Sequence, residues 1–507
     1  MRTSPDAIVI GAGPNGLTSA AMLARSGMRV LVLEAQKEPG GAVRTAEVTL
    51  PGFKHDLGAA FFPFGQLSPA FIPLDLPGAG LVWKHADFES AHPAPDGTCA
   101  AISRDLSLEV CREGFGEDAK AWRDVALWHR ETKEKMLAAL LTTLPAAKNM
   151  LRFGVDNLIR LAYVALSSGR GWAQNEFTTE AARRVVPGLA LHTDVGPDDP
   201  MGAVVGFVLA VLASSGGFAV PEGGSGSITK ALLHRLTEAG GEVQCGTRVS
   251  EIVVREGRAV AVRTEGGEEI EAKRAIVADV AAPALYLRML PEGSVPARIR
   301  SAMKVFRHGF GTFKVDWALD GPVPWETELS RRSAVVHAGD SLDDLAHFTK
   351  QVREGELPFN PYLVVGQQSI ADPTRAPAGK HTLWAYSRVP SRLDRYKGGW
   401  EAEREAFADR IDDRIEGLAP GFKKRVLARR IWAPGDLEAM DENLIGGDLA
   451  GGTAAITRQL IFRPVFPWYR YRTPVAGLYL GSSYTHPGAG VHGACGANAA
   501  LAALEDA

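Results

Sequence analysis

Near the N-terminus, two short apolar runs flank a stretch of helical periodicity. Residues 6–10 (Asp-Ala-Ile-Val-Ile) and residues 29–33 (Arg-Val-Leu-Val-Leu) are typical of strands. Between them, Leu, Ala and Met recur at helical spacing over residues 17–26, and Gly27 ends the pattern. The order predicts a β-α-β unit, in which a helix connects two parallel strands.

The rest of the chain divides into regions with different patterns. Residues 242–278 predict a hairpin-rich sheet followed by one buried strand, and residues 477–504 predict a strand, a glycine-rich loop and an alanine-rich helix. Residues 86–215 are predicted to be mostly helical, whereas residues 291–444 mix strands with helices and include a strand at 311–319. The two segments therefore differ in character from the regions that surround them.

One predicted helix in the first of these segments is amphipathic. Its apolar face is formed by Leu151, Val155, Leu158, Ile159 and Ala162. Basic side chains lie elsewhere on it, at Lys148, Arg152 and Arg160. Such a helix either packs its apolar face against the core or lies on a membrane surface and passes an apolar substrate inward.

Composition narrows the class of protein. A chain of 507 residues predicts two domains, and a net charge of −3 gives no basic surplus for nucleic acid. The four cysteines, Cys99, Cys111, Cys245 and Cys495, form no CxxC pair, so we expect reduced thiols, no disulfide framework and no metal site. No signal peptide precedes the first strand, and the apolar run 201–213 is too short to span a bilayer. We expect a cytoplasmic protein.

The first turn of the β-α-β unit carries a GxGxxG loop, made by Gly11, Gly13 and Gly16. The first glycine permits the tight turn, the second lets a diphosphate approach the backbone, and the third lets the helix pack on the strand. Glu34 closes the second strand, where its carboxylate can accept hydrogen bonds from a ribose diol and would repel a 2′-phosphate. The unit predicts a dinucleotide site, without distinguishing NAD from FAD.

The residues after Glu34 indicate which dinucleotide binds. The run Pro39-Gly40-Gly41-Ala-Val-Arg44-Thr45 resembles the extended signature of the FAD family that includes amine oxidases and phytoene desaturases. In that family the Gly-Gly pair and the arginine lie along the flavin diphosphate, and the guanidinium fork of Arg44 suits phosphate oxygens. A surface salt bridge is the alternative role for Arg44. A second GxGxxG motif and a redox cysteine pair are both lacking, so the sequence predicts a single flavin.

The C-terminal stretch strengthens this resemblance. Leu-Tyr-Leu-Gly481 is followed by Thr-His486-Pro-Gly-Ala-Gly-Val491-His492-Gly493 and an alanine-rich helix. It resembles the C-terminal motif of phytoene-desaturase-like FAD oxidoreductases, with Ala489 in place of a glycine. Gly446-Gly447-Asp448 and Arg463-Pro464 are similar to the pyridine-nucleotide-disulfide-oxidoreductase-like branch.

The resemblance implies a fold and a division into domains. The fold is α/β, a Rossmann-type, glutathione-reductase-like FAD-binding domain with an inserted mixed α+β substrate domain. We expect residues 1–85, 216–290 and 445–507 to form the FAD-binding domain, and residues 86–215 and 291–444 to form the substrate domain.

The resemblance also implies the cofactor contacts. The residues expected to bind FAD are Gly11, Gly13, Pro14, Asn15, Gly16, Glu34, Gly40, Gly41, Arg44, Val249, Gly481, Val491 and Gly493. For Val249 the alternative is an ordinary sheet valine. The catalytic candidates are His486 and His492, either of which could shape the flavin pocket or accept a proton; the alternative is a hydrogen-bonded loop histidine.

The implied function is FAD-dependent dehydrogenation or saturation of C–C bonds in a small apolar substrate, an isoprenoid or polyene such as a carotenoid. Hydride would pass to or from flavin N5. One alternative is an amine or amino-acid oxidase that uses oxygen, with Lys304 or Lys314 as the lysine near the flavin. Another is a flavoprotein with a regulatory role. We expect no nucleic-acid partner and contact with a membrane surface; the sequence does not predict an oligomeric state.

Overall fold

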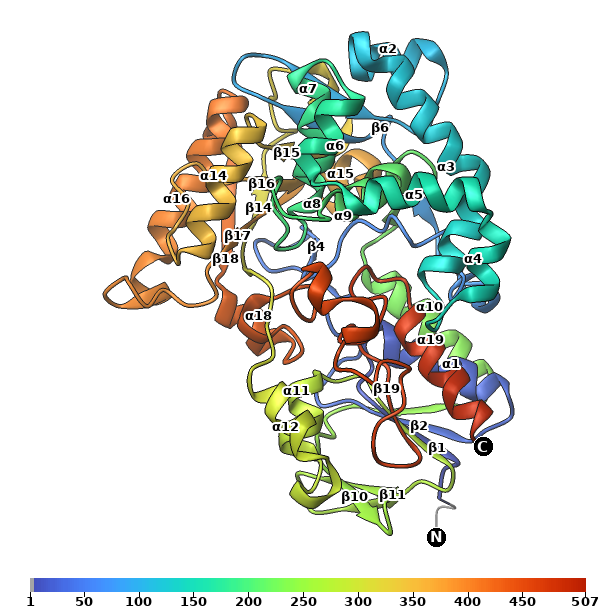
Figure 1. The fold of residues 1–507 in the computed structure, drawn as a ribbon. Helices are drawn as coiled ribbons and strands as arrows, with labels where there is room; N and C mark the ends of the chain where they lie inside the picture. The colour runs from blue at the N-terminus through green and yellow to red at the C-terminus, as the bar shows by residue number, and fades with distance from the viewer. Residues whose placement is uncertain (1–3) are drawn as a thin grey trace.

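The structure is a computed structural model that describes residues 4–507. A five-stranded parallel sheet lies in one half of the molecule and a seven-stranded mixed sheet in the other (Figure 1). The parallel sheet has the order β19-β13-β1-β2-β9. Its strands are β1 (Ala7–Ile10), β2 (Val30–Leu33), β9 (Glu242–Gln244), β13 (Ala275–Ala278) and β19 (Leu478–Leu480). This arrangement confirms the predicted Rossmann-type fold.

The parallel sheet is buried on both faces because β1, β2, β13 and β19 are apolar at every position, whereas the edge strand β9 reads Glu-Val-Gln. In β1, Ala7 and Val9 pack against one layer, whereas Ile8 and Ile10 pack against the other. The first layer contains α1 (Pro14–Arg25), α10 (Gly226–Glu238) and α19 (Ala494–Glu505). The second contains the hairpin sheet β10 (Val249–Arg255), β11 (Arg258–Thr264) and β12 (Glu269–Glu271), with α12 (Ala297–Lys304).

The larger sheet has the order β18-β14-β17-β16-β15-β6-β7. Its strands are β6 (Phe88–Pro93), β7 (Cys99–Ile102), β14 (Gly311–Leu319), β15 (Ser333–Ala338), β16 (Leu363–Gly366), β17 (His381–Val389) and β18 (Val426–Trp432). One face packs on α16 (Gly399–Leu418). The other face is directed at residues 55–64, since Phe61 and Trp384 pack with ring centroids 5.7 Å apart and His55 lies beside Asp316.

The segment predicted to be mostly helical also supplies two strands. Its helices include α3 (Ala119–Leu140), α8 (Val185–Ala190) and α9 (Ala203–Ala213), but β6 and β7 precede them. The prediction missed β6 because Phe-Glu-Ser-Ala-His-Pro has no apolar alternation, and the strand is fixed by parallel pairing with β15, more than 200 residues later. Every strand of the larger sheet falls within the predicted substrate-domain ranges, while the exact domain boundaries stay a prediction.

The predicted amphipathic helix is two helices. Gly154, at φ +93°, separates α4 (Ala147–Phe153) from α5 (Val155–Leu166). Leu151, Val155 and Ile159 are 78%, 66% and 64% exposed. The predicted alternative, in which the apolar face packs against the core, is therefore wrong for these three side chains. Leu158 does pack against the core. Across residues 4–507, no helix is long and apolar enough to cross a membrane, and α9 is largely buried.

Candidate functional site

Two glycines of the turn between β1 and α1 lie so close to neighbouring backbone atoms that a side chain would not fit. Gly11 has φ +95°, and a Cβ added there would lie 2.9 Å from the Asp279 carbonyl oxygen. A Cβ on Gly16 would overlap the Gly11 carbonyl oxygen, so the third glycine is required for α1 to approach β1. The predicted roles of these two glycines therefore match the local packing.

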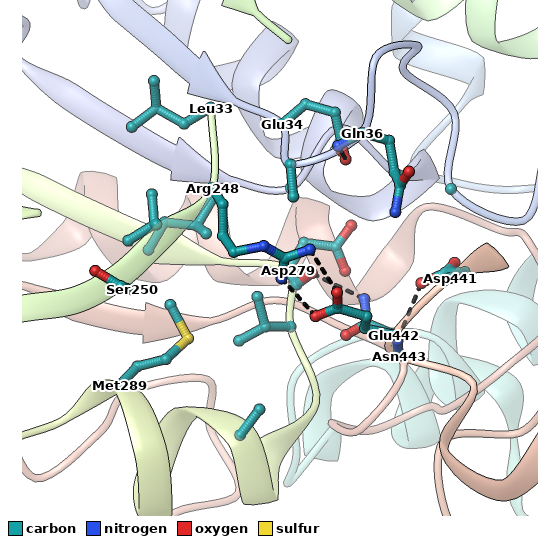
Figure 2. A pocket seen from close by; sticks show the side chains of 18 of the residues that line it. Leu33, Glu34, Gln36, Arg248, Ser250, Asp279, Met289, Asp441, Glu442 and Asn443 are labelled. Carbon is teal, nitrogen blue, oxygen red and sulfur yellow. Dashed lines mark hydrogen bonds and ion pairs between the residues drawn. The ribbon is translucent and has the colours of Figure 1, made fainter. Parts of the chain in front are cut away.

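A pocket opens at the carboxyl ends of β1, β2 and β13 (Figure 2). Five of the predicted cofactor-binding residues line it: Gly11, Gly13, Glu34, Gly41 and Val249. The others lie outside its lining: Pro14, Asn15, Gly16, Gly40, Arg44, Gly481, Val491 and Gly493. Apolar walls come from Leu33 and Met289, and polar groups come from Arg248, Asp279 and Asp441. The pocket thus has the mixed lining that a nucleotide needs.

Glu34 is fixed at the end of β2 by the backbone around it. The Ala12 N–H donates to Oε2 at 2.7 Å, and the Gln36 N–H donates to Oε1 at 2.8 Å. Each carboxylate oxygen keeps further lone-pair capacity, so Glu34 can still accept hydrogen bonds from a ribose diol. The side chain is held where the Rossmann pattern requires an acceptor.

Arg44 reinforces the second glycine-rich turn. Its Nε donates to the Gly41 carbonyl at 2.9 Å, and Nη2 donates to the Met440 carbonyl at 3.1 Å. Gly41 has φ +53°, and a Cβ on it would lie 3.3 Å from Gly13 Cα. The two glycine-rich turns are therefore in direct contact. Arg44 positions them, and a contact between Arg44 and phosphate stays a prediction.

Asp279 is a pocket residue that the sequence analysis missed. It follows β13, and the Gly16 N–H donates to its Oδ2 at 2.8 Å. Burial raises its pKa to about 8, and the nearby Asp441 and Glu34 carboxylates act in the same direction. A neutral carboxyl does not repel a diphosphate and can donate a hydrogen bond to it. The signal was present, since ligands of parallel α/β sheets bind at the carboxyl ends of strands.

Arg248 is a second pocket residue that was missed. It directly precedes Val249, and its guanidinium forms an ion pair with Glu442, with Nη1 to Oε2 at 2.7 Å (Figure 2). This pair joins the strand that carries Val249 to the segment after α18 (Pro434–Met440). It brings a positive charge to a pocket that otherwise contains several carboxyl groups.

The C-terminal loop and α19 pack in the half of the molecule that contains the parallel sheet and the pocket. The Gly481 N–H donates to the Ala278 carbonyl at 2.9 Å, and a Cβ on Gly481 would lie 3.0 Å from Ala499 Cβ. Gly493, at φ +68°, is the N-cap of α19, and a Cβ there would lie 2.5 Å from Phe71 Cε1. Val491 is a non-glycine residue at φ +49°. The three predicted residues shape the loop rather than line the pocket.

The two candidate histidines lie in this loop and are buried. The Ala494 N–H donates to His492 Nδ1 at 3.0 Å, and burial lowers the His492 pKa to about 4. The His486 carbonyl accepts from the Tyr471 hydroxyl at 2.7 Å, and burial also lowers the His486 pKa to about 4. Both Nε2 atoms are buried without a hydrogen-bond partner. Because Nδ1 of His492 already accepts, its neutral ring carries the proton on Nε2 and is a donor there.

The two candidate lysines differ in burial. Lys304 ends α12 and is exposed. Lys314, on β14, is buried, and its Nζ donates to the Asp316 carboxylate at 2.5–2.7 Å. Lys314 therefore lies on the sheet face directed at residues 55–64, with its charge compensated.

These observations fit one known family. The sequence profile described as "Flavin containing amine oxidoreductase" matches residues 15–500. The chain belongs to the flavin-containing amine oxidoreductase family.

Relatives within and around this family match nearly the whole chain. Mouse pyridine nucleotide-disulfide oxidoreductase domain-containing protein 2 is 29% identical over 99% of this chain and 93% of its own. The neurosporene-forming phytoene desaturase of Cereibacter sphaeroides is 25% identical over 98% and 94%. An oxidoreductase structure from Methanosarcina mazei has a TM-score of 0.66 at 17% identity, covering 98% of this chain and 99% of its own. The branch predicted from the sequence is confirmed.

As a member of the flavin-containing amine oxidoreductase family, the protein is an FAD-dependent oxidoreductase. The pocket fits FAD in three respects: bare glycine turns where a diphosphate approaches, an oriented acceptor at Glu34, and apolar walls at Leu33 and Met289. The individual contacts between FAD and the predicted residues stay predictions.

Proposed function

We propose that the protein dehydrogenates or saturates C–C bonds in an apolar substrate, an isoprenoid or polyene. The observation that carries the proposal is similarity over the whole chain to proteins named for this chemistry. Besides the phytoene desaturases, a limonene dehydrogenase chain from Castellaniella defragrans is 24% identical over 99% of this chain and 94% of its own. Both names refer to hydrocarbon substrates without an ionised group.

The sheet face beside residues 55–64 supports an apolar substrate. It carries Trp384 and Tyr386, whose rings stack with centroids 5.5 Å apart, and Phe61 packs on Trp384. Lys314 and Asp316 on this face neutralise each other, and the Arg388 guanidinium on the same face donates to the Thr312 hydroxyl and to backbone carbonyls. The aromatic rings of this face suit a hydrocarbon substrate.

The chemistry divides between cofactor and protein. FAD, when bound, supplies a two-electron acceptor that takes hydride from carbon. The chain would hold the dinucleotide at the pocket of Figure 2, with Glu34 on the ribose. His492 would contribute a buried Nε2–H donor in the C-terminal loop, and His486 would contribute a buried imidazole in the same loop.

The test is anaerobic reduction by a polyene. The purified FAD-loaded protein is mixed with phytoene in lipid vesicles, and the visible flavin bands are recorded. Bleaching of the bands with formation of a more conjugated product is the expected result. Bands that persist with phytoene, and also with limonene, would contradict the proposal and leave the FAD assignment intact.

The main alternative is an amine oxidase that uses oxygen, and the position of Lys314 favours it. A buried lysine on the sheet face next to residues 55–64 is the feature that this alternative requires. A putrescine oxidase structure has a TM-score of 0.61 at 18% identity over 99% of both chains, a likeness of fold. Hydrogen peroxide release from putrescine or cyclohexylamine in air would favour the alternative; a flavin that no substrate reduces would favour a regulatory role.

We also propose that the protein is cytoplasmic and contacts membranes through α4 and α5. Three exposed apolar side chains, Leu151, Val155 and Ile159, stand beside the basic residues Arg152 and Arg160. The triple variant with aspartate at the three apolar positions is expected to lose sedimentation with anionic vesicles. Phe359→Asp, at a side chain 82% exposed elsewhere, is the control and should sediment as before.

A further inference from the structure

Five side chains of the larger sheet and the segment after α8 form one continuous hydrogen-bonded chain; four of them are buried and His192 is partly exposed. Tyr386 Oη is joined to His192 Nδ1 at 3.1 Å, and His192 Nε2 to His337 Nε2 at 2.8 Å. His337 Nδ1 is joined to Ser90 Oγ at 2.9 Å, and Ser90 Oγ to His92 Nε2 at 2.9 Å. We call these five residues the relay.

The sheet register holds the relay together. His337 on β15 lies opposite Val364 on β16, and Val364 lies opposite Tyr386 on β17, so His337 and Tyr386 share one face. His92 stacks on His337 with ring centroids 4.7 Å apart. Tyr386 is in turn opposite Lys314, and the Arg388 guanidinium lies 5.1 Å from the Tyr386 ring.

Proton counting gives His192 and His337, the two central rings of the relay, only two arrangements. One proton occupies each contact, so the contact between the two Nε2 atoms forces His192 and His337 into opposite neutral tautomers. In one arrangement the Tyr386 hydroxyl donates to His192, and all the protons point toward His92. In the other, His192 Nδ1 donates to Tyr386, whose own proton is then directed away from the relay. Burial lowers the pKa of all three imidazoles, which favours these neutral arrangements.

An aromatic line connects the Tyr386 end of the relay to the C-terminal loop. Tyr386 stacks on Trp384, and Trp384 packs on Phe61 with centroids 5.7 Å apart. Three residues later, Phe64 meets the His492 ring edge-on at 5.4 Å. The relay therefore ends on the side of the sheet that faces the FAD-binding half.

We propose that Tyr386 exchanges the substrate proton during C–C dehydrogenation, and that His192, His337, Ser90 and His92 carry that proton away. The inference rests on the proposed function. Tyr386 is the member that would meet substrate; the other four are positioning residues.

Every proton and electron is conserved in this step. Dehydrogenation breaks C–H bonds on two neighbouring carbons, and one hydrogen leaves with its electron pair to oxidised FAD. The electron pair of the other C–H bond becomes the π bond, and its proton goes to Tyr386 Oη. The Tyr386 proton passes to His192, each contact shifts one proton, and His92 Nε2 receives the last. His92 then returns to neutrality by giving its Nδ1 proton to water. Saturation runs the same shifts backwards.

The first test is turnover of phytoene in lipid vesicles by FAD-loaded variants. Tyr386→Phe is expected to lower kcat about 100-fold with an unchanged flavin spectrum, and Ser90→Ala about tenfold, as loss of a positioned proton-transfer group does. Matched controls are Tyr362→Phe, a buried tyrosine whose hydroxyl donates to the Gly188 carbonyl outside the relay, and Ser387→Ala. Both controls should stay within twofold. Equal kcat for Tyr386→Phe and wild type would overturn the proposal while the proposed function stands.

The second test needs no substrate. Long-range ¹H–¹⁵N spectra of the FAD-loaded protein, labelled at histidine, are expected to show His192 and His337 in opposite neutral tautomers at pH 7. Tyr386→Phe should change their tautomer populations, and Tyr362→Phe should not. Identical tautomers on both rings would overturn the relay. A wild-type protein that never oxidises phytoene would instead overturn the proposed function, and with it the role of Tyr386 toward substrate.

Discussion

The cofactor pocket and the relay both bury ionisable groups, and burial acts on them in opposite directions. In the pocket, burial raises the pKa of the Asp279 carboxyl to about 8; in the relay, it lowers the pKa values of His92 and His192 to about 3. In each case the uncharged form is favoured, and it is the protonated form of an acid but the deprotonated form of a base. The Asp279 carboxyl and the relay imidazoles are therefore both uncharged near pH 7, and their contributions to stability should respond to pH with opposite sign.

The largest expected effect comes from breaking the pocket. Gly16→Ala places a Cβ onto the Gly11 carbonyl oxygen, a backbone atom that cannot move aside without separating α1 from β1. We expect a loss of about 4 kcal/mol in unfolding free energy and loss of bound FAD. Urea denaturation and the flavin spectrum measure the two effects. Gly417→Ala in α16, where an added Cβ meets nothing within 4 Å, is the control and should retain FAD and full stability.

The next largest effect tests how the buried Asp279 carboxyl makes stability depend on pH. Because the Asp279 pKa is raised in the folded state, its stabilising contribution is complete below the unfolded pKa near 3.8 and is lost as the pH rises toward 8. Asp279→Asn keeps an oxygen acceptor for Gly16 N–H and removes the titration. Relative to wild type, the FAD-free variant should gain about 3 kcal/mol between pH 5 and pH 8, measured by urea denaturation. The exposed Asp124→Asn is the control, and a variant that tracks wild type at both pH values would refute the assignment.

The buried relay histidines should make stability depend on pH in the reverse direction. The His337 pKa is lowered well below 6.5 by burial and by His92 and His192, so the unfolded chain takes up the proton first as the pH falls. Stability that is present above pH 6.5 is therefore lost between pH 6.5 and pH 4.5. His337→Gln should reduce this loss, seen by comparing urea midpoints at pH 7 and pH 4.5. The exposed His347→Gln should leave the loss unchanged.

The smallest expected effect is the loss of FAD affinity when Glu34 is replaced. Glu34 accepts from two backbone N–H groups, and Glu34→Gln replaces one acceptor oxygen with a donor that faces an N–H. FAD affinity should fall about tenfold, equivalent to about 1.4 kcal/mol, in a fluorescence titration. Affinity equal to wild type would indicate that Glu34 serves the turn alone.

The two regions also differ in how far the sequence alone predicts them. The pocket is encoded locally: strand, glycine turn, helix, second strand and Glu34 follow one another within residues 7–34. Gly41 and Val249 also line it. Asp279 was missed although it directly follows a predicted strand, because a single aspartate after an apolar run has no distinctive spacing.

The relay could not be predicted in this way. Ser90, His192, His337 and Tyr386 lie far apart along the chain and meet through the register of β15, β16 and β17. Register depends on which strands pair, and one sequence gives no such information for a sheet of order β18-β14-β17-β16-β15-β6-β7. The sequence instead drew attention to His486 and His492, which are close together in the chain but have no partner on Nε2.

The packing of α19 on α1 has a consequence for how the protein is made. A Cβ on Gly496 would overlap the Asn15 carbonyl oxygen, so the first helix of the chain is covered by the last, and β19 completes the edge of the parallel sheet. During synthesis α1 emerges long before α19, since residues 26–493 lie between the two helices, and the side of α1 that α19 covers stays exposed in that interval. That exposed apolar side is a surface that chaperones acting on nascent chains would shield.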